Sequence, residues 1–392
     1  MRKIRLDLFK LYDKSERKKG AIKVILTSKL KKIIKEIIEE VKAREKVRKR
    51  ELIEKFGISY SAFRISFLRN RLPLSFVKKL ADYSLSYKEK ILDEIKELSS
   101  GSGNNYVKVK APKFLSETLC KIVGAIIADG NLYVGKGRRK WQIKIGDQYE
   151  DNLRLFSKWL KEEFNITPKI KKDKRLRMFY IDFSNKVVFY YLNRILGIKV
   201  GKKSSEAGMP PIIKKSPFNF QVAFAVGLCM FDGSIGFTRR NFCFSTKSKK
   251  LVKDFNMILR KLNINYSYTS KPNPSNNLYQ TFIWSENELR KVLRYLLEPH
   301  TSKWMQLNIL LNGLKNVNSK ILNSIGTLYP LPRKTSIGFL DVIKVFRKDV
   351  SLSKKEVQLK INRSERTTRA LLNSLERMKV LKAKRNKFYK LW

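Results

Sequence analysis

An internal repeat constrains the fold of this chain more than any other feature. Two apolar nonapeptides, Ile122 to Gly130 and Ala225 to Gly233, end in the same Asp-Gly pair. The offset between the two acids is 232 − 129 = 103 positions, and an alternating strand pattern follows each of them at a similar interval. The chain therefore carries two copies of one supersecondary unit.

The later parts of the two copies also correspond. Phe183-Ser184 and Trp284-Ser285 lie 101 positions apart, and each pair opens a segment with helical spacing of apolar residues. We predict an α+β core at residues 111–328, an α-β-β-α-β-β-α unit duplicated with pseudo-twofold symmetry, with repeat one at 111–200 and repeat two at 215–312. An unrelated tandem α+β protein is the alternative.

Residues 1–98 are predicted to form an all-α helix-turn-helix domain that binds DNA. A basic helix from Thr27 to Arg48 precedes a short helix that Gly57 stops, and a second short helix follows. Arg64 and Arg69 place positive charge on or just after that second helix. A plain helical hairpin is the alternative.

The segment 99–110 is predicted to be a linker, because Ser99 to Asn105 is rich in Gly, Ser and Asn. Two prolines between Tyr329 and Arg333 mark a second break. Residues 333–392 are predicted to form a winged-helix DNA-binding domain of three helices and a basic two-stranded wing, with Arg366 and Arg369 on the third helix. A surface for a partner protein is the alternative.

The charge of the chain identifies the class of partner. Lys and Arg number 86 against 34 Asp and Glu, a formal net charge of +52. Such an excess favours a polyanion, and we expect double-stranded DNA rather than a membrane, since no apolar run approaches the ~20 residues that a span needs. Solvated lysine-rich helix faces are the alternative. We expect a monomeric, cytoplasmic protein associated with the nucleoid through DNA.

The scarcity of sulfur and imidazole restricts the metal chemistry. The cysteines are Cys120, Cys229 and Cys243, and His300 is the single histidine. A zinc site needs four clustered ligands, so no zinc is expected. A catalytic metal would take oxygen ligands, which is typical of Mg²⁺, with Mn²⁺ as a substitute.

The two nonapeptides resemble the paired motifs of the LAGLIDADG homing endonucleases. Gly201-Lys202-Lys203 followed by Met209-Pro210 is similar to the segment that joins the two motifs in that family, and the resemblance covers about Ala111 to Leu311. Phe231 departs from the pattern, because a small residue is usual there. The resemblance implies a site-specific endonuclease that cleaves double-stranded DNA with a divalent metal.

The motif helices explain how such a site would form. Gly124, Ala128 and Gly227 leave room for two helices to cross closely, which would bring Asp129 and Asp232 together at their carboxyl ends. Two carboxylates there repel unless a cation lies between them. We predict a metal site at Asp129 and Asp232 with the adjoining Gly130 and Gly233.

Lysines are expected to neutralise the transition state beside each acid. Lys202 or Lys203 would serve one half and Lys303 the other, because Lys202 falls on Lys303 at the offset of 101, and the family uses such lysines. His300 lies near Lys303, but a lone histidine in a loop is more often structural.

Outward residues of the predicted strands would read bases in the major groove. They are Gln142, Lys144, Asn241, Ser245 and Lys247. A non-cleaving transcription regulator or an RNA splicing factor built on the same core is the alternative function.

Overall fold

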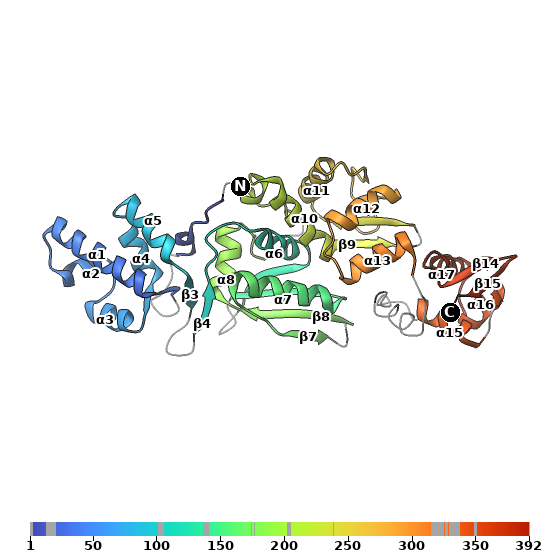
Figure 1. Ribbon diagram of the computed structural model, residues 1–392, viewed down its shortest axis with the longest axis horizontal. Helices are drawn as coiled ribbons and strands as arrows, with labels where there is room; N and C mark the ends of the chain where they lie inside the picture. Colours follow the sequence, from blue (N-terminus) through green and yellow to red (C-terminus); the bar gives the residue numbers. More distant parts are fainter. Residues whose placement is uncertain are drawn as a thin grey trace.

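The computed structural model describes residues 3–12, 21–100, 106–135, 141–173, 175, 177–201, 205–237, 239–314, 325, 328, 338–348 and 351–391. It has three parts in line: an amino-terminal domain, a central core and a carboxy-terminal domain (Figure 1). The predicted break from Tyr329 to Arg333 lies outside the described residues.

The core contains two copies of one unit. Repeat one runs α6 (Glu117–Ala128), β5 (Gly130–Val134), β6 (Trp141–Asp147), α7 (Glu150–Phe164), β7 (Ile170–Asp173), β8 (Met178–Ser184) and α8 (Lys186–Tyr190), which continues into η2 (Tyr191–Ile195). Repeat two runs α10 (Phe218–Asp232), β9 (Gly233–Gly236), β10 (Asn241–Thr246), α11 (Lys249–Lys261), β11 (Ser267–Tyr268), β12 (Tyr279–Ile283) and α12 (Glu286–Tyr295). The predicted α-β-β-α-β-β-α duplication is confirmed.

The two sheets share one topology. Their strand orders are β5-β6-β8-β7 and β9-β10-β12-β11, antiparallel throughout. Each motif helix passes directly into the first strand of its sheet, so an acid lies at each helix-to-strand junction. Two further helices flank repeat two: α9 (Pro211–Lys214) precedes it and α13 (Ser302–Asn312) follows it.

The amino-terminal domain is not all-α, which corrects the sequence prediction. Its helices are α1 (Ser28–Glu45), α2 (Lys49–Lys55), α3 (Tyr60–Leu68), α4 (Leu74–Ala81) and α5 (Leu85–Glu94). A four-stranded sheet in the order β2-β1-β3-β4 joins them, formed by β2 (Arg71–Pro73), β1 (Lys23–Ile25), β3 (Glu97–Ser100) and β4 (Val107–Lys110). These strands are only three or four residues long and have no extended alternation, so periodicity did not reveal them.

The predicted linker is also mostly wrong. Ser99 and Ser100 belong to β3, residues 107–110 form β4, and the two strands pair antiparallel, with Leu98 opposite Val109. Residues 101–105 lie outside the described part of the chain. The two strands form an antiparallel pair in which Leu98 and Val109 are fully buried.

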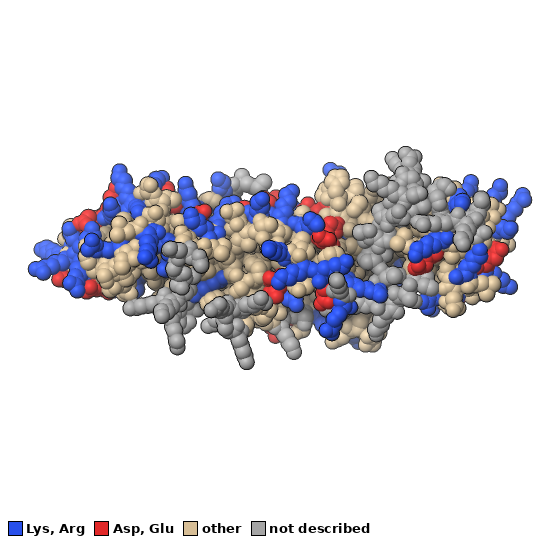
Figure 2. Space-filling view, turned by 90° about the horizontal axis from the view of Figure 1, so that it is seen from below, with Lys and Arg blue, Asp and Glu red and all other residues tan. Residues whose placement is uncertain are grey.

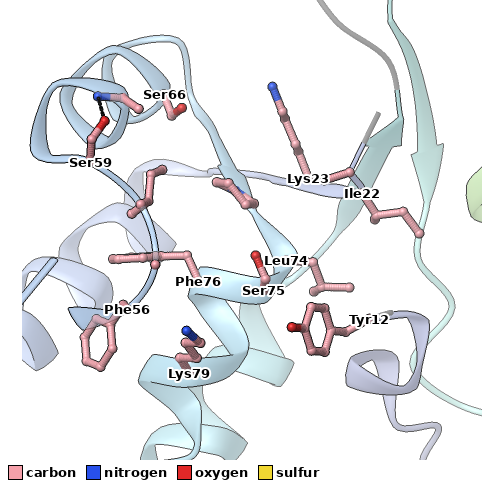
Figure 3. Close-up of a pocket in the computed structure, with 15 residues that line it drawn as sticks. Tyr12, Ile22, Lys23, Phe56, Ser59, Ser66, Leu74, Ser75, Phe76 and Lys79 are labelled. Atoms are coloured by element: carbon pink, nitrogen blue, oxygen red, sulfur yellow. Dashed lines mark hydrogen bonds between the residues drawn. The ribbon is translucent and has the colours of Figure 1, made fainter. Parts of the chain in front are cut away.

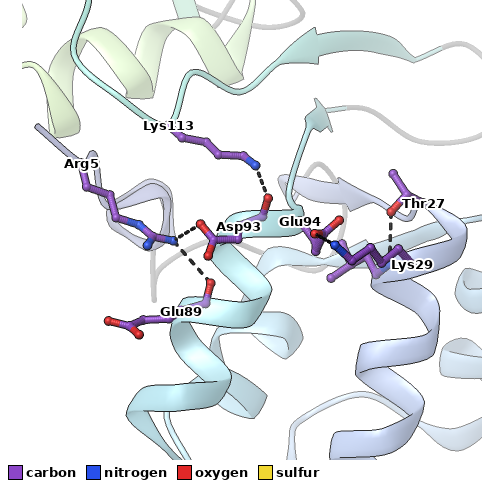
Figure 4. A network of polar contacts seen from close by, with 8 residues as sticks. Arg5, Thr27, Lys29, Glu89, Asp93, Glu94 and Lys113 are labelled. Carbon is purple, nitrogen blue, oxygen red and sulfur yellow. Dashed lines mark hydrogen bonds and ion pairs between the residues drawn. The ribbon is translucent and has the colours of Figure 1, made fainter. Parts of the chain in front are cut away.

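The amino-terminal segment ties this domain to the core. Leu6 donates its N–H to the Lys113 carbonyl at 2.7 Å, and Leu115 donates to Ile4 at 2.9 Å. Arg5 donates to the Asp93 carboxylate at 2.9 Å, while the Lys113 ammonium bonds the Asp93 carbonyl (Figure 4). One short segment therefore contacts both α5 and the entry to the core.

The described residues of the carboxy-terminal domain form three helices and a small sheet. The elements are α15 (Phe339–Lys348), β13 (Ser351–Ser353), α16 (Lys354–Ile361), α17 (Glu365–Arg377), β14 (Leu381–Lys384) and β15 (Lys387–Lys390), with strand order β13-β15-β14. Strand β13 was not predicted. The domain touches the core where Arg377 donates to the Phe237 carbonyl at 2.7 Å and Leu314 donates to that of Met378 at 2.8 Å.

Candidate active site

The two motif helices pack at glycine contacts that leave no room for a side chain. A Cβ at Gly124 would lie 2.2 Å from the Phe224 carbonyl oxygen, and one at Gly227 would lie 2.2 Å from that of Lys121. Lys121 and Phe224 are themselves 103 positions apart, as are the two glycines. The contact therefore obeys the pseudo-twofold symmetry of the repeat.

The carboxyl ends of α6 and α10 lie at the same end of this helix pair. Gly130 begins β5 just after α6 and pairs with Ile145 of β6, and β6 ends two residues later at Asp147. The amide of Asn152 donates both to Asp147 at 2.8 Å and to the Met230 carbonyl in the last turn of α10 at 2.9 Å. Asp129 caps α6 and Asp232 ends α10, each five residues beyond its glycine.

These ends carry negative potential that would suit a cation. The carbonyls of a helix carboxyl end bear partial negative charge, and each acid adds a carboxylate there. Among the described residues, no three His, Cys, Asp or Glu side chains converge as a ready metal cluster. The oxygens available to a cation at these helix ends are two carboxylates and neighbouring backbone carbonyls, a kind of ligand that hard cations accept.

Lys303 lies at the same helix end, but its ammonium is hydrogen-bonded to backbone carbonyls. Its side chain is 4% exposed, and its ammonium donates to the Phe231 carbonyl at 2.8 Å and the Cys229 carbonyl at 3.4 Å. Burial raises the pKa of the nearby Asp147, and the charge of Lys303 opposes that rise. The structure thus shows Lys303 holding the turn that precedes Asp232.

The other predicted residues near the acids are distributed differently. Lys202 and Lys203 lie outside the described residues. His300 is exposed at φ +64° with its ring 5.6 Å from that of Trp304. Phe231 is buried with its ring edge-on to Phe156 of α7 at 6.2 Å.

The outer sheet faces hold only part of the predicted reading set. Lys144 and Lys247 are exposed and Ser245 is half-buried. Gln142 and Asn241 are 7% and 4% exposed, so the prediction that both project into solvent is wrong. Gln142 lies between Tyr133 and Ser184 on neighbouring strands, and Asn241 lies against Gly236, where a Cβ would be 2.1 Å from its Oδ1.

Sequence reasoning missed polar and aromatic residues on the partner strands. Tyr180 of β8 faces Lys144 and Lys171, whose ammonium groups lie 5.4 and 6.0 Å from its ring. Gln280 of β12 is opposite Ser245 and donates to its hydroxyl at 3.2 Å. The alternation along 178–184 and 279–283 carried this signal.

The flanking domains place their predicted basic residues on surfaces. Gly57 adopts φ +86° between α2 and α3, and Arg64 and Arg69 are exposed. Arg366 and Arg369 are exposed on α17. Lys and Arg side chains extend along the length of one face, across all three parts (Figure 2).

Comparison with known proteins identifies one domain. Residues 219–296 match the model of the LAGLIDADG-like domain, which confirms the resemblance for the repeat that contains Asp232. The chain is also 26% identical over 185 residues to an A-type ATP synthase subunit of Pyrococcus abyssi, a stretch that spans 47% of this chain and 17% of that protein.

Two solved structures are among those that match this chain. The homing endonuclease I-DmoI in complex with DNA and Mn is 21% identical, covering 47% of this chain and 98% of its own, with a TM-score of 0.37. Full-length WhiA from Thermatoga maritima is 14% identical, and the match covers 67% of this chain and 90% of WhiA with a TM-score of 0.33.

No helix in the described part of the chain is long and apolar enough to cross a membrane.

Proposed function

We propose, starting from the LAGLIDADG-like domain of residues 219–296, that this protein is a site-specific double-stranded DNA endonuclease of homing type. The observation that carries the proposal is the glycine-to-glycine helix contact, which puts Asp129 and Asp232 at the same end of one helix pair. Two carboxylates that face phosphate would weaken DNA binding by a chain of net charge +52 unless they hold a metal ion. Their pairing therefore favours a metal-dependent function.

Asp129 and Asp232, with the backbone of Gly130 and Gly233, would hold Mg²⁺, or Mn²⁺ in its place. The bound cation would lower the pKa of a water and neutralise phosphate charge during hydrolysis. The residues of the chain supply the position: the two glycines fix the helix spacing, and Asn152 and Lys303 fix the last turn of α10.

Duplex DNA would lie along the outer faces of both core sheets. Lys144, Lys171 and Lys247 would contact the phosphate backbone, and Ser245 with Gln280 would face base edges. The helix-turn-helix of α2 and α3 and the winged-helix arrangement of α15 to β15 would grip flanking duplex. Arg64, Arg69, Arg366 and Arg369 would make those contacts.

A non-cleaving DNA-binding regulator or RNA splicing factor is the second candidate. The observation that favours it is Lys303, whose ammonium bonds backbone carbonyls instead of standing free beside the acids. A core that had lost cleavage would keep its sheets and its charge, so binding alone does not separate the two functions.

Neutralising either acid separates them. The substrate would be DNA fragments recovered with the purified protein, and Asp129→Asn and Asp232→Asn would be compared with wild type. An endonuclease should lose magnesium-dependent cutting of both strands by at least ~100-fold, because each change removes a charged ligand of a shared metal site. DNA binding without metal should persist or tighten, because a carboxylate facing phosphate is neutralised.

Asp82→Asn provides the control, since Asp82 is an exposed acid at the end of α4, outside the core. It should leave cutting unchanged. Full cutting by Asp129→Asn would refute the catalytic assignment. A wild-type protein that never cuts its own bound fragments would establish the non-cleaving function.

A further inference from the structure

A cavity of about 340 Å³ lies in the amino-terminal domain, remote from the paired acids. Five parts of the domain meet around it: the end of η1 (Leu8–Leu11) at Tyr12, strand β1, the turn between α2 and α3, α3 itself, and α4 with the residue before it (Figure 3). The volume falls in the range of pockets that hold small organic molecules, roughly 300–1,000 Å³.

The lining is apolar with a few polar groups. Ile22, Phe56, Ile58, Leu74 and Phe76 supply hydrocarbon and aromatic surface. Tyr12, Ser59, Ser66 and Ser75, each of which carries a hydroxyl, line the same space, and the Ser59 hydroxyl accepts the N–H of Ala62. An apolar wall with few hydrogen-bonding groups is the usual composition of a site that binds one oriented small molecule.

The charge of the lining has one sign. Lys23 of β1 and Lys79 of α4 both line the cavity, whereas no Asp or Glu is found among the described lining residues. Neither ammonium forms an ion pair within the described part of the chain, although Lys78, next to Lys79 on α4, is paired with Asp82. Burial lowers the pKa of Lys23, and the charges of Arg71 and Arg69 lower it further.

The Lys79 side chain extends to the turn between α2 and α3. Its ammonium lies 3.1 Å from where a Cβ would stand on Gly57, the residue at φ +86° between α2 and α3. A ligand held by Lys79 would therefore touch the turn and the first half of α3 through Ser59 and Ala62.

We propose that this cavity binds a small organic anion with an apolar body. Its anionic group would accept hydrogen bonds from Lys79 and the Ser75 hydroxyl, and its body would pack on Phe56, Leu74 and Phe76. Lys23, which lies on the opposite side of the lining, would add positive potential (Figure 3). An anion fits because it compensates two positive charges that the described lining leaves unbalanced. The inference does not depend on nuclease activity.

Two dyes with one aromatic body test the charge requirement. The anion 8-anilinonaphthalene-1-sulfonate should bind the full chain at one saturable site, and N-phenyl-1-naphthylamine, which lacks the sulfonate, should bind more weakly. Lys79→Met should weaken binding of the anion about tenfold, the effect of one hydrogen bond to a charged group, and Lys23→Met should weaken it by a smaller factor. Each change should alter binding of the neutral dye by less than about twofold.

Lys78→Met is the matched control, because it removes the same charge one residue away on α4, outside the cavity. It should leave both dyes unchanged. Ser66→Leu, which narrows the cavity from α3, should weaken both. Equal anion binding by wild type, Lys23→Met and Lys79→Met would overturn the proposal.

Wild-type protein provides a measurement that needs no variant. Saturation with the anionic dye should slow amide hydrogen exchange in residues 56–62 and 74–79, where the lining is densest. Slowing confined to other segments would place the dye elsewhere on the basic surface and also overturn the proposal.

Discussion

Gly124 and Gly227 determine how closely the motif helices approach. Each would place a new Cβ 2.2 Å from a backbone oxygen of the opposite helix, and backbone cannot rotate away as a side chain can. Gly124→Ala and Gly227→Ala should each destabilise the chain by about 3 kcal/mol or more, the upper end of overpacking costs, when measured by chemical denaturation.

Gly146→Ala is the control for this prediction. Its Cβ would meet the terminal methyl of Met178 at 2.5 Å, which a flexible side chain can relieve. Its free energy of unfolding should change by less than about 1 kcal/mol. Equal effects at Gly146 and Gly124 would show that the helix contact is not tight.

Lys303 allows a structural role to be distinguished from a catalytic one. Lys303→Met would leave the Phe231 carbonyl without its buried partner and remove the positive charge near Asp147. We expect a loss of about 2–4 kcal/mol in unfolding free energy, with cleavage lost alongside it. Lys199→Met, which removes an exposed ion pair with Glu206, should cost under about 1 kcal/mol. Unchanged stability with abolished cleavage would make Lys303 catalytic.

Sequence alone predicted that Asp129 and Asp232 lie at the ends of the two motif helices, but not which residues contact those ends. The repeated motif was sufficient to predict the positions of Asp129 and Asp232, because the spacing of residues along one helix is a local property of the sequence. It could not give Asn152, whose contact with Met230 joins residues 78 positions apart. It also placed Gln142 and Asn241 in solvent, since alternation assigns a face of a sheet without showing which neighbours cover it.

Among the elements, the longest were predicted best. Helix α1 begins at Ser28 beyond the cap of Thr27, close to the predicted start, because eighteen residues carry a clear apolar stripe. Strands β1 to β4 have three or four residues each and gain their stability from one another across the chain. No local window contains that pairing, so the domain was predicted as all-α.

The hairpin of β3 and β4 yields a test at this scale. Leu98 is fully buried between Val24 and Val109, whereas a linker residue would be solvent-exposed. Leu98→Ala should lower the unfolding free energy of the amino-terminal domain by about 2–5 kcal/mol. Leu85→Ala, at a leucine that is 74% exposed, should change it by less than about 0.5 kcal/mol. A negligible effect of Leu98→Ala would restore the linker interpretation.

The whole molecule combines a duplicated core with two basic flanking domains. The repeat was visible in the sequence because both copies keep the Asp-Gly ending, and the structure gives them one sheet topology. How the flanks meet the core was not predictable, since the bonds of Leu6 with Lys113 and of Arg377 with Phe237 join residues that are far apart in the sequence. These contacts hold basic surfaces in line along the molecule (Figure 2).

Removing the carboxy-terminal domain tests whether that alignment serves DNA binding. A chain ending at residue 332 loses the Arg377 bond to the Phe237 carbonyl and the packing of Phe339 on the Phe237 ring, but keeps both core repeats and their helix pair. We expect the core to unfold cooperatively as before and DNA to bind more weakly. Each neutralised phosphate contributes a slope of about −0.9 to the log-log dependence of affinity on salt, so this dependence should also become shallower.

The double substitution Arg366→Gln and Arg369→Gln in the full chain should likewise make the salt dependence of DNA affinity shallower, without truncation. An unchanged slope after truncation would show that this domain does not contact phosphate, and unfolding of residues 111–311 would show that the core depends on it.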